Sequence, residues 1–241
     1  MFKFNLQSER KRIGILGGTF DPPTISHIDI AKESLLQQVV DEVWVGFIYQ
    51  NQTEDQLIFI FIQIVPCGLR TDKQTQTEPK HRLEMVKIAA QELIEQNKSL
   101  EGKLITNDIE VKNNRTIPTY PLMKRFEKEY PEFDFYFLMG YDLIKGLLSW
   151  DEGQSLVEEI KFIIAGQPNL EWKQFDDYFP KNYKLIKIYQ NVRSTNYRKT
   201  IVDSYKQNNN TFAADLGLEA GLLSQNIINY IIQNNLYVQQ N

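Results

Sequence analysis

The sequence contains very few side chains that bind metals or form cross-links. It has one cysteine, Cys67, and two histidines, His27 and His81. A structural zinc site needs about four Cys or His ligands, so that class of site is excluded, and we expect no protein-held metal. A single cysteine also excludes an internal disulfide framework, and nothing in the cysteine content points to an oxidising compartment.

Long apolar runs are also missing. The longest, LIFIFIQIV at residues 57–65, contains a glutamine, and it is much shorter than the roughly twenty residues of a membrane-spanning helix. Residues 1–12, MFKFNLQSERKR, lack the apolar core of a secretory signal. We therefore expect no membrane association and a cytoplasmic location, with the nucleus as an alternative.

An excess of positive charge is absent as well. The 27 basic and 31 acidic residues give a net charge of −4, whereas a dedicated nucleic-acid binder carries a strong basic excess. We expect no nucleic-acid partner. A small anionic substrate is compatible with this balance, because it needs only a local basic patch.

Short apolar runs alternate with amphipathic segments along the chain, which predicts an α/β fold with a doubly wound parallel sheet. We expect a single domain over residues 1–241, with its core at about 12–192 and a helical C-terminal cap at about 193–238. The expected strands are 12–18, 40–48, 104–111, 133–140, 161–168 and 184–190. The expected helices are 28–39, 78–98, 119–131 and 155–160, with further helices between 195 and 237.

Residues 46–64, GFIYQNQTEDQLIFIFIQI, interrupt this alternation. They separate VDEVWV from VPCG, which would otherwise join as one strand and its following loop. The segment is either a hairpin with TEDQ as its turn or a sequence artefact, such as an incorrectly translated intervening segment. We attach no function to it.

The string GGTFDPPTISH, residues 17–27, follows the first expected strand and begins the first expected helix. The two glycines allow backbone N–H groups to approach an anion, and the start of a helix adds unpaired donors and a partial positive charge. His27, in the first turn of the helix, can donate to a phosphate oxygen. Glycines before a helix and a solvated histidine are the plain structural alternative.

A second anion-binding pattern occurs in VRSTNYRK, residues 192–199. Ser194 and Thr195 suit a helix N-terminus, and Arg198 falls one turn later on the same face. Two hydroxyls, free helix N–H groups and an arginine together form an anion site. The alternative is an ordinary capped surface helix.

GGTFDPPTISH resembles the GGTFDPxHxGH signature of the nucleotidyltransferase superfamily. The rest of the chain resembles the nicotinate/nicotinamide mononucleotide adenylyltransferases, apart from residues 46–64. The segments that match in order are KHRLEMVKIA (80–89), NDIEVKNNRTIPTYPLMKRFEKEYP (107–131), FYFLMGYDLIKGLLSWDEG (135–153), KFIIAGQP (161–168), VRSTNYRK (192–199) and INYIIQNNLY (228–237). Several ordered matches are more specific than any single motif.

The resemblance implies a role for each matching residue. The residues implied in ATP binding are Gly17, Gly18, Thr19, Phe20, His27, Gly140, Asp142, Ser194, Thr195 and Arg198. Those implied in catalysis are Thr24, His27, Lys73 and Arg198, and those implied around the pyridine ring are Thr119, Tyr120 and Trp150. We expect His81 and Arg82 to lie on the helix surface, although they fall in a matched segment.

Two residues depart from the signature: Thr24 replaces its first histidine, and Ser26 replaces the glycine before His27. A neutral donor in place of a charged one costs about 1–2 kcal/mol, while positioning contributes up to about 7–11 kcal/mol. We therefore expect slower chemistry rather than none. Ser26 adds bulk near the phosphates and is expected to weaken ATP binding.

The resemblance implies an enzyme that transfers AMP from ATP to a pyridine mononucleotide, giving NAD or its nicotinate form and pyrophosphate. Its partners are then ATP and nicotinate or nicotinamide mononucleotide, with Mg²⁺ carried by the ATP phosphates, and a homo-oligomer is compatible with the sequence. One alternative is a pantetheine-phosphate adenylyltransferase, which Thr24 favours because a threonine occurs there in that family. Another is a catalytically impaired nucleotide-binding regulatory protein. An oxidoreductase is disfavoured, because GGTF is not GxGxxG.

Overall fold

The computed structural model describes residues 10–45, 65–66, 77–106, 117–189, 198 and 221–237. The strands are β1 (Lys11–Gly18), β2 (Glu42–Val45), β3 (Val65–Pro66), β4 (Leu104–Thr106), β5 (Phe133–Gly140), β6 (Lys161–Gly166) and β7 (Asn182–Lys187). The α-helices are α1 (Ile25–Leu36), α2 (Pro79–Gln96), α4 (Thr119–Glu129), α5 (Gly153–Glu159) and α8 (Gln225–Gln233). Three 3₁₀ helices are η1 (Lys98–Leu100), η2 (Tyr141–Ser149) and η3 (Trp172–Tyr178).

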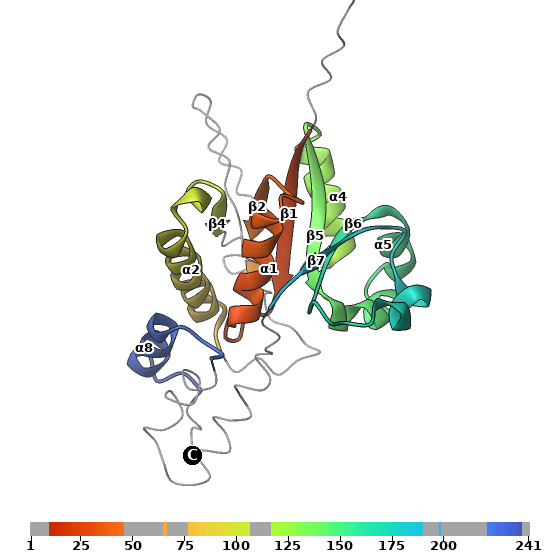
Figure 1. Cartoon of the computed structure of the whole chain (residues 1–241). Helices are drawn as coiled ribbons and strands as arrows, with labels where there is room; N and C mark the ends of the chain where they lie inside the picture. Colours follow the sequence, from red (N-terminus) through yellow and green to blue (C-terminus); the bar gives the residue numbers. More distant parts are fainter. Residues whose placement is uncertain are drawn as a thin grey trace, which may run out of the picture.

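The strands form one parallel sheet in the order β4-β2-β1-β5-β6-β7, and β3 also pairs with β1 (Figure 1). From β1 the chain builds outward to β2 and β4, then returns to β5 and builds outward on the other side. The strand order therefore reverses between β1 and β5. In open parallel sheets this reversal creates a ligand site beyond the carboxyl ends of the strands, and the predicted doubly wound fold is confirmed.

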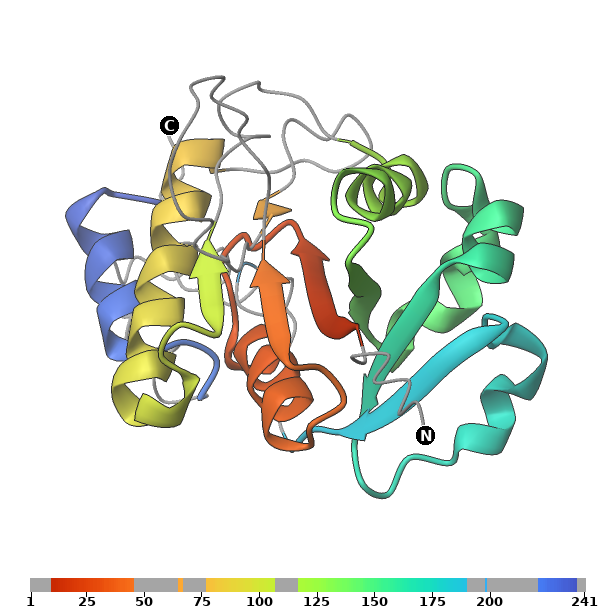
Figure 2. The same ribbon diagram turned by 90° about the horizontal axis from the view of Figure 1, so that it is seen from above.

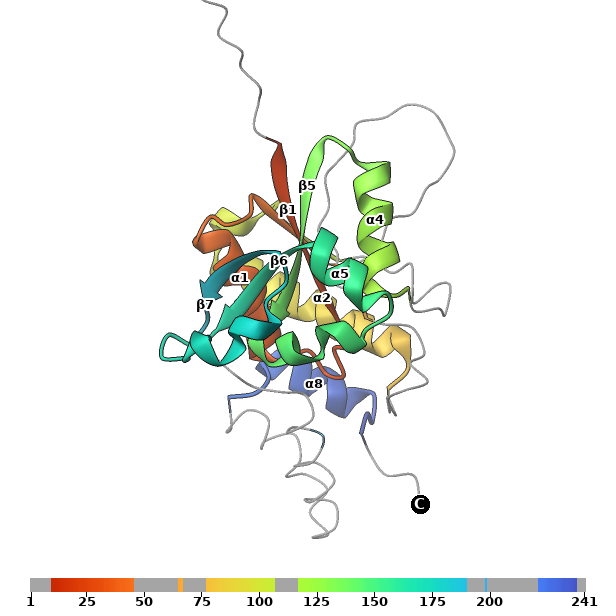
Figure 3. The same ribbon diagram turned by 90° about the vertical axis from the view of Figure 1, so that its right-hand side faces the viewer.

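Helices cover both faces of the sheet, with α1 on one face and α4 and α5 on the other (Figures 2 and 3). Parallel strands joined by crossover helices require this arrangement, because each apolar face must be buried. The start of α1 follows from its sequence: Thr24 is the N-cap residue, in extended conformation. Threonine and serine both suit an N-cap; the helix uses Thr24 in this way, and Ser26 lies inside it.

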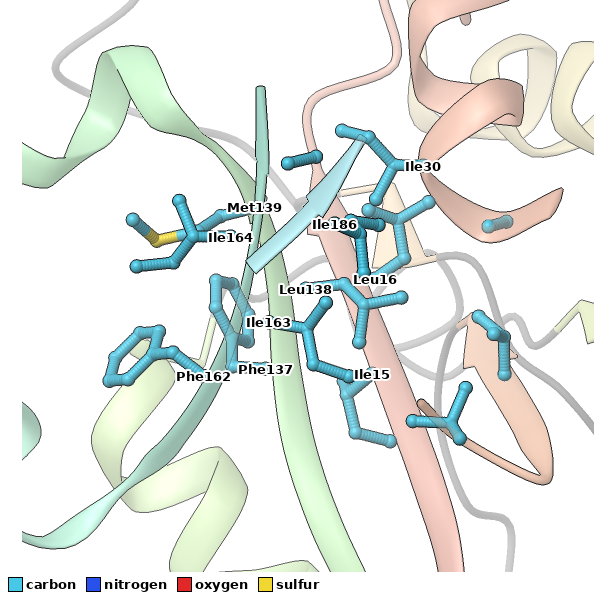
Figure 4. Packing of buried hydrophobic residues seen from close by; sticks show 14 of the residues in the cluster. Ile15, Leu16, Ile30, Phe137, Leu138, Met139, Phe162, Ile163, Ile164 and Ile186 are labelled. Atoms are coloured by element: carbon cyan, nitrogen blue, oxygen red, sulfur yellow. The ribbon is translucent and has the colours of Figure 1, made fainter. Parts of the chain in front are cut away.

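The core lies between the central strands and their helices (Figure 4). Leu16, Leu138 and Ile163 project from three adjacent strands toward Ile30 of α1, whereas side chains of alternate positions, such as Phe137, project to the opposite face. All five are at most 6% exposed. Largely apolar runs such as FDFYFLMG are typical of strands buried on both faces.

Strands β2 and β3 occupy successive positions beside β1. Ile15 pairs with Trp44, and Gly17 pairs with Val65. If the β2 register continued, Gly46 would stand opposite Gly17, so Val65 takes the place that Gly46 would have in an unbroken strand. Figure 2 shows β3 beyond the tip of β2. This register agrees with the expectation that VDEVWV and VPCG would join as one strand; residues 46–64 lie outside the described residues.

A second, smaller core joins the C-terminal part to α2. It contains Met85 and Ala89 of α2, and Leu222, Leu223, Ile227, Ile228, Ile231 and Tyr237 from the C-terminal part. Helix α8 begins at the N-cap Ser224, whose hydroxyl accepts a hydrogen bond from the Ile227 N–H. The predicted C-terminal helical cap is thus observed over the residues described there.

Candidate active site

The site expected from the sequence lies at the reversal of strand order. β1 ends at Gly18 and β5 ends at Gly140, and the two strands are parallel neighbours. The turn that follows β1 and the turn that follows β5 therefore leave the same edge of the sheet. Helix α1 starts immediately after the first turn and directs its N-terminal donors toward this edge.

The first turn is tight and folds back on itself. Phe20 has a φ of 49°, a left-handed backbone conformation that is strained for a bulky residue, and its side chain is only 1% exposed. The Phe20 ring lies over Gly18, where a Cβ atom would approach the ring to 2.9 Å. Only glycine fits beneath the ring, so the turn can present backbone rather than side chains to a ligand.

His27 is held by the residue that begins its helix. The backbone N–H of Thr24 donates to His27 Nδ1 at 3.0 Å, and the Thr24 hydroxyl lies 2.8 Å from the same nitrogen. A backbone N–H can only donate, so Nδ1 is an acceptor and the neutral ring carries its proton on Nε2. The edge of the Phe20 ring packs on the imidazole at 5.0 Å.

Burial lowers the pKa of His27 to about 4, from an ordinary value of 6.5. The imidazole is therefore neutral near pH 7 when no ligand is bound. A polyanion placed beside Nε2 would favour the charged form, because opposite charge raises the pKa of a histidine.

The C-terminal part of the chain reaches the same turn. Arg198 donates a short hydrogen bond from its guanidinium to the carbonyl oxygen of Asp21. The Tyr237 hydroxyl donates to the Asp21 carboxylate at 2.7 Å, and the Ile25 N–H donates to the Leu222 carbonyl at 3.0 Å. Arg198, which the resemblance implies in ATP binding, therefore lies against the turn that follows β1.

The turn after β5 contains a close contact between Gly140 and Asp142. A Cβ atom on Gly140 would lie 2.5 Å from Asp142 Oδ1, so a larger residue at this position would displace the carboxylate from the strand end. Asp142 itself is exposed. Gly140 and Asp142 therefore lie at the end of β5, one strand away from the turn that follows β1.

The residues predicted around a pyridine ring lie on two elements: η2, which follows β5, and α4, which precedes β5. Trp150 ends η2 and packs edge-on against Phe137, at 6.1 Å between ring centroids. The Phe137 ring also limits the space at Gly17, where a Cβ atom would meet it at 3.0 Å. Phe137 thus links Trp150 to the end of β1. Thr119 is the first residue of α4, and the adjacent Tyr120 directs its hydroxyl to Glu159 of α5 at 3.0 Å.

Comparison with known proteins assigns this architecture to a family. The model of the cytidylyltransferase-like family matches residues 15–200. The nicotinate-nucleotide adenylyltransferase of Bacillus subtilis is 32% identical over 158 residues, which cover 66% of this chain and 70% of the relative. A probable nicotinate-nucleotide adenylyltransferase of Oceanobacillus iheyensis is 32% identical over 159 residues, or 66% of this chain and 69% of the relative. The chain belongs to the nicotinate-nucleotide adenylyltransferase family.

Solved structures of this family share the fold. The nicotinic acid mononucleotide adenylyltransferase of Plasmodium falciparum, complexed with NaAD, superposes with a TM-score of 0.66 and 30% identity. The alignment covers 94% of this chain and 97% of that chain. The same enzyme complexed with APC gives a TM-score of 0.64 at 28% identity.

Arg82 is a site residue that sequence reasoning misplaced. We expected it on the surface of its helix, but it is fully buried. Its guanidinium donates to the Thr19 carbonyl at 2.8 Å and to the Thr77 carbonyl at 3.2 Å. A member of this nucleotidyltransferase family thus carries a buried cation directly beneath the turn predicted to hold ATP. The matched segment KHRLEMVKIA was the available signal, because a family match at a charged residue allows a buried role.

Three predicted site residues, Lys73, Ser194 and Thr195, lie outside the described residues.

Over the described ranges there is no group of three His, Cys, Asp or Glu side chains that could hold a metal ion. In the same ranges, no helix has both the length and the apolar character needed to cross a bilayer.

Proposed function

We propose that this protein transfers the adenylyl group of ATP to nicotinate mononucleotide, giving the nicotinate dinucleotide and pyrophosphate. The observation that carries the proposal is the likeness, over 94% of the chain, to an adenylyltransferase that is described as complexed with NaAD. The arrangement at the reversal of strand order supports it, because a glycine turn, a helix N-terminus, His27 and Arg198 gather on one edge.

The reaction needs alignment more than acid–base chemistry. An oxygen of the mononucleotide 5′-phosphate attacks the α-phosphorus of ATP in line. A new P–O bond forms, the bond to the bridging oxygen of the β-phosphate breaks, and pyrophosphate leaves with the electron pair. The attacking oxygen is already an anion, so no general base is required. Positioning of two reactants can supply about 7–11 kcal/mol of the barrier.

The protein supplies donors where negative charge develops. His27 offers its Nε2–H, since Nδ1 accepts the Thr24 N–H. Arg198 adds a permanent positive charge beside Asp21, and Lys73, Ser194 and Thr195 are proposed to complete the triphosphate site. Preorganised donors of this kind are commonly worth about 3–4 kcal/mol each in phosphoryl or acyl transfer.

Mg²⁺ is proposed to arrive with the ATP phosphates. The described ranges hold no trio of protein ligands for a cation, which suits an ion that keeps most of its waters and binds through substrate phosphates. When bound, it neutralises charge on the leaving pyrophosphate. The protein residues then need only to orient the triphosphate.

Thr119, Tyr120 and Trp150 are proposed to surround the pyridine ring. Thr119 and Tyr120 form the first turn of α4, where free backbone N–H groups favour a carboxylate over an amide. This position of the α4 N-terminus supports nicotinate rather than nicotinamide as the substrate.

A direct assay tests the proposal. Purified protein is incubated with Mg·ATP and, in parallel, with nicotinate mononucleotide, nicotinamide mononucleotide or phosphopantetheine, and the products are identified by mass spectrometry with pyrophosphate release. We expect the nicotinate dinucleotide to form fastest. Product with phosphopantetheine alone would make it the sister enzyme, and ATP binding without pyrophosphate release under any acceptor would make it a regulatory nucleotide binder.

A further inference from the structure

Asp21 connects the turn after β1 to the C-terminal part of the chain through its backbone carbonyl and its carboxylate. Its carbonyl oxygen accepts from Arg198, and its carboxylate accepts from the Tyr237 hydroxyl. Asp21 is 1% exposed, and its hydrogen bond with Tyr237 is buried away from water. A hydrogen bond to a buried carboxylate is stronger than one between neutral groups, and its loss leaves a desolvated charge with one donor fewer.

Tyr237 reaches Asp21 from a strained position. Its φ is 65°, and Asn235, two residues earlier, has a φ of 48°. Left-handed backbone at a bulky residue persists only where the surroundings impose it. Here the surroundings are the second core, in which Tyr237 is 7% exposed beside residues of α2 and α8. The apolar contacts fix the ring, and the hydroxyl is thereby aimed at Asp21.

We infer that Tyr237 is a positioning residue for the turn after β1, residues 17–21, which is proposed to bind ATP. The Tyr237 hydroxyl holds the Asp21 carboxylate, and the Asp21 carbonyl holds Arg198 against the same residues. The inference rests on the proposed function, because it assumes that residues 17–21 and Arg198 bind ATP. Tyr237 itself acts through Asp21 and contacts no reacting atom. Tyr237 ends the matched segment INYIIQNNLY, but none of the residues implied in ATP binding or catalysis lies in that segment.

Tyr230 provides a matched control in the same part of the chain. Its hydroxyl also makes a hydrogen bond, to His81 Nδ1 at 2.9 Å, and its ring packs edge-on against the imidazole at 5.9 Å. This contact joins α8 to α2, as Tyr237 also does through the second core. Tyr230 and Tyr237 therefore share a structural role, but only Tyr237 touches the first turn.

The experiment compares Tyr237→Phe with Tyr230→Phe in the full-length protein. Each variant loses one hydroxyl and keeps its ring. We measure kcat, the KM for ATP and for nicotinate mononucleotide, the Kd of ATP by calorimetry, and the thermal midpoint. For Tyr237→Phe we expect the KM and Kd for ATP to rise about tenfold, the loss of one charge-assisted hydrogen bond, with a smaller change in kcat. For Tyr230→Phe we expect both constants to stay within about twofold of the wild type while the thermal midpoint falls.

A double-mutant comparison tests whether Tyr237 affects ATP binding through Asp21. In an Asp21→Asn background the charge that the tyrosine hydroxyl supports is gone, so adding Tyr237→Phe should weaken ATP binding by clearly less than it does in the wild type. If Tyr237→Phe does not yield folded protein, Asp21→Asn alone is compared with the wild type. It keeps the side-chain shape and is expected to raise the Kd of ATP.

The outcomes separate this inference from the proposed function. A wild type that binds ATP but makes no dinucleotide would refute the proposed function, while the Kd of ATP would still decide the role of Tyr237. A folded Tyr237→Phe variant that binds ATP as the wild type does would overturn the inference. So would equal losses in Tyr237→Phe and Tyr230→Phe, because these would mean a purely structural role.

Discussion

Thr24 and His27 form a closed pair at the start of α1: the Thr24 backbone N–H donates to His27 Nδ1 at 3.0 Å, and the Thr24 hydroxyl lies 2.8 Å from that nitrogen. The pair orients the imidazole so that Nε2 is the free position. Because the oriented bond comes from backbone, it does not depend on the side chain at position 24. The structure thus gives a reason why threonine can stand where the signature has a histidine.

This geometry predicts unequal effects of mutating the two residues. His27→Ala should lower turnover at least about a hundredfold, because it removes a preorganised donor. Thr24→Val keeps the shape and the backbone N–H, so it should lower turnover less than about tenfold and cost about 1 kcal/mol of stability as a lost N-cap. Both are measured by pyrophosphate release, with circular dichroism to show that the fold is intact. An unaffected rate in His27→Ala would remove His27 from the mechanism.

The buried imidazole predicts a pH dependence of stability. The pKa of His27 is about 4 in the folded protein and 6.5 in an unfolded chain, so between these values the unfolded state binds the extra proton. The contribution of His27 to the free energy of unfolding is then fully present above pH 6.5 and is lost as the pH drops toward 4. The loss is at most roughly 3 kcal/mol, and it is smaller because the ring keeps some exposure. Denaturant titrations over this range measure the loss, and His27→Gln should flatten it.

Nuclear magnetic resonance can observe the same group directly, since His27 and His81 are the only histidines in the sequence. With His81→Asn, a single labelled imidazole remains. We expect it to titrate near pH 4 without ligand and at higher pH with ATP bound, because the triphosphate favours the charged ring. A ligand-free titration near pH 6.5 would show that His27 is not buried as described.

Arg82→Met should damage both stability and nucleotide binding. The change leaves the carbonyls of Thr19 and Thr77 without their buried donor, which costs about 2–4 kcal/mol of unfolding free energy. The KM for ATP should also rise, because Thr19 lies in the turn after β1 that is proposed to bind ATP. Arg125→Met is the control: its partner Glu129 lies on the exposed face of α4, so stability should change by less than about 0.5 kcal/mol. Equal stability of the two variants would contradict a supporting role for Arg82.

The register of β2 and β3 predicts that residues 46–64 can be removed. Joining Val45 to Val65 continues the β2 register beside β1, with Val65 still opposite Gly17. We expect the shortened chain to fold and to keep its activity, measured by thermal unfolding and dinucleotide synthesis. Removing 46–65 instead shifts every following residue by one position and reverses the faces of the strand. That variant should lose stability; if both deletions behave alike, the two strands are not one interrupted strand.

Much of the fold could be predicted because its signals are local. β5 was expected at residues 133–140 and is observed at Phe133–Gly140, since a largely apolar run of strand length between a proline and a glycine specifies a buried strand. The start of α1 is less sharply defined by sequence, because Thr24 and Ser26 both suit an N-cap, and the structure uses Thr24. The 3₁₀ helix η2 was not predicted, since its residues show no clear helical period and form only short-range hydrogen bonds.

Residues of the candidate site could be predicted only where they fall in a recognisable sequence motif. The first turn, His27 and the Gly140 turn could be placed from sequence, because glycines and caps define turns locally. Arg82 was misplaced because its partner Thr19 lies 63 residues away, and a charged residue on an amphipathic helix is usually exposed. The tautomer of His27 could not be predicted either, since it follows from the position of one backbone N–H.

The distance in sequence between Asp21 and its partners also matters during synthesis of the chain. Asp21 leaves the ribosome early, but Arg198 follows 177 residues later and Tyr237 follows 216 residues later. A nascent chain can pair its strands as they emerge, yet it cannot finish the turn after β1 until Tyr237 has been made. Translation products that stop short of this tyrosine would therefore leave the ribosome without the Tyr237–Asp21 hydrogen bond at the turn after β1.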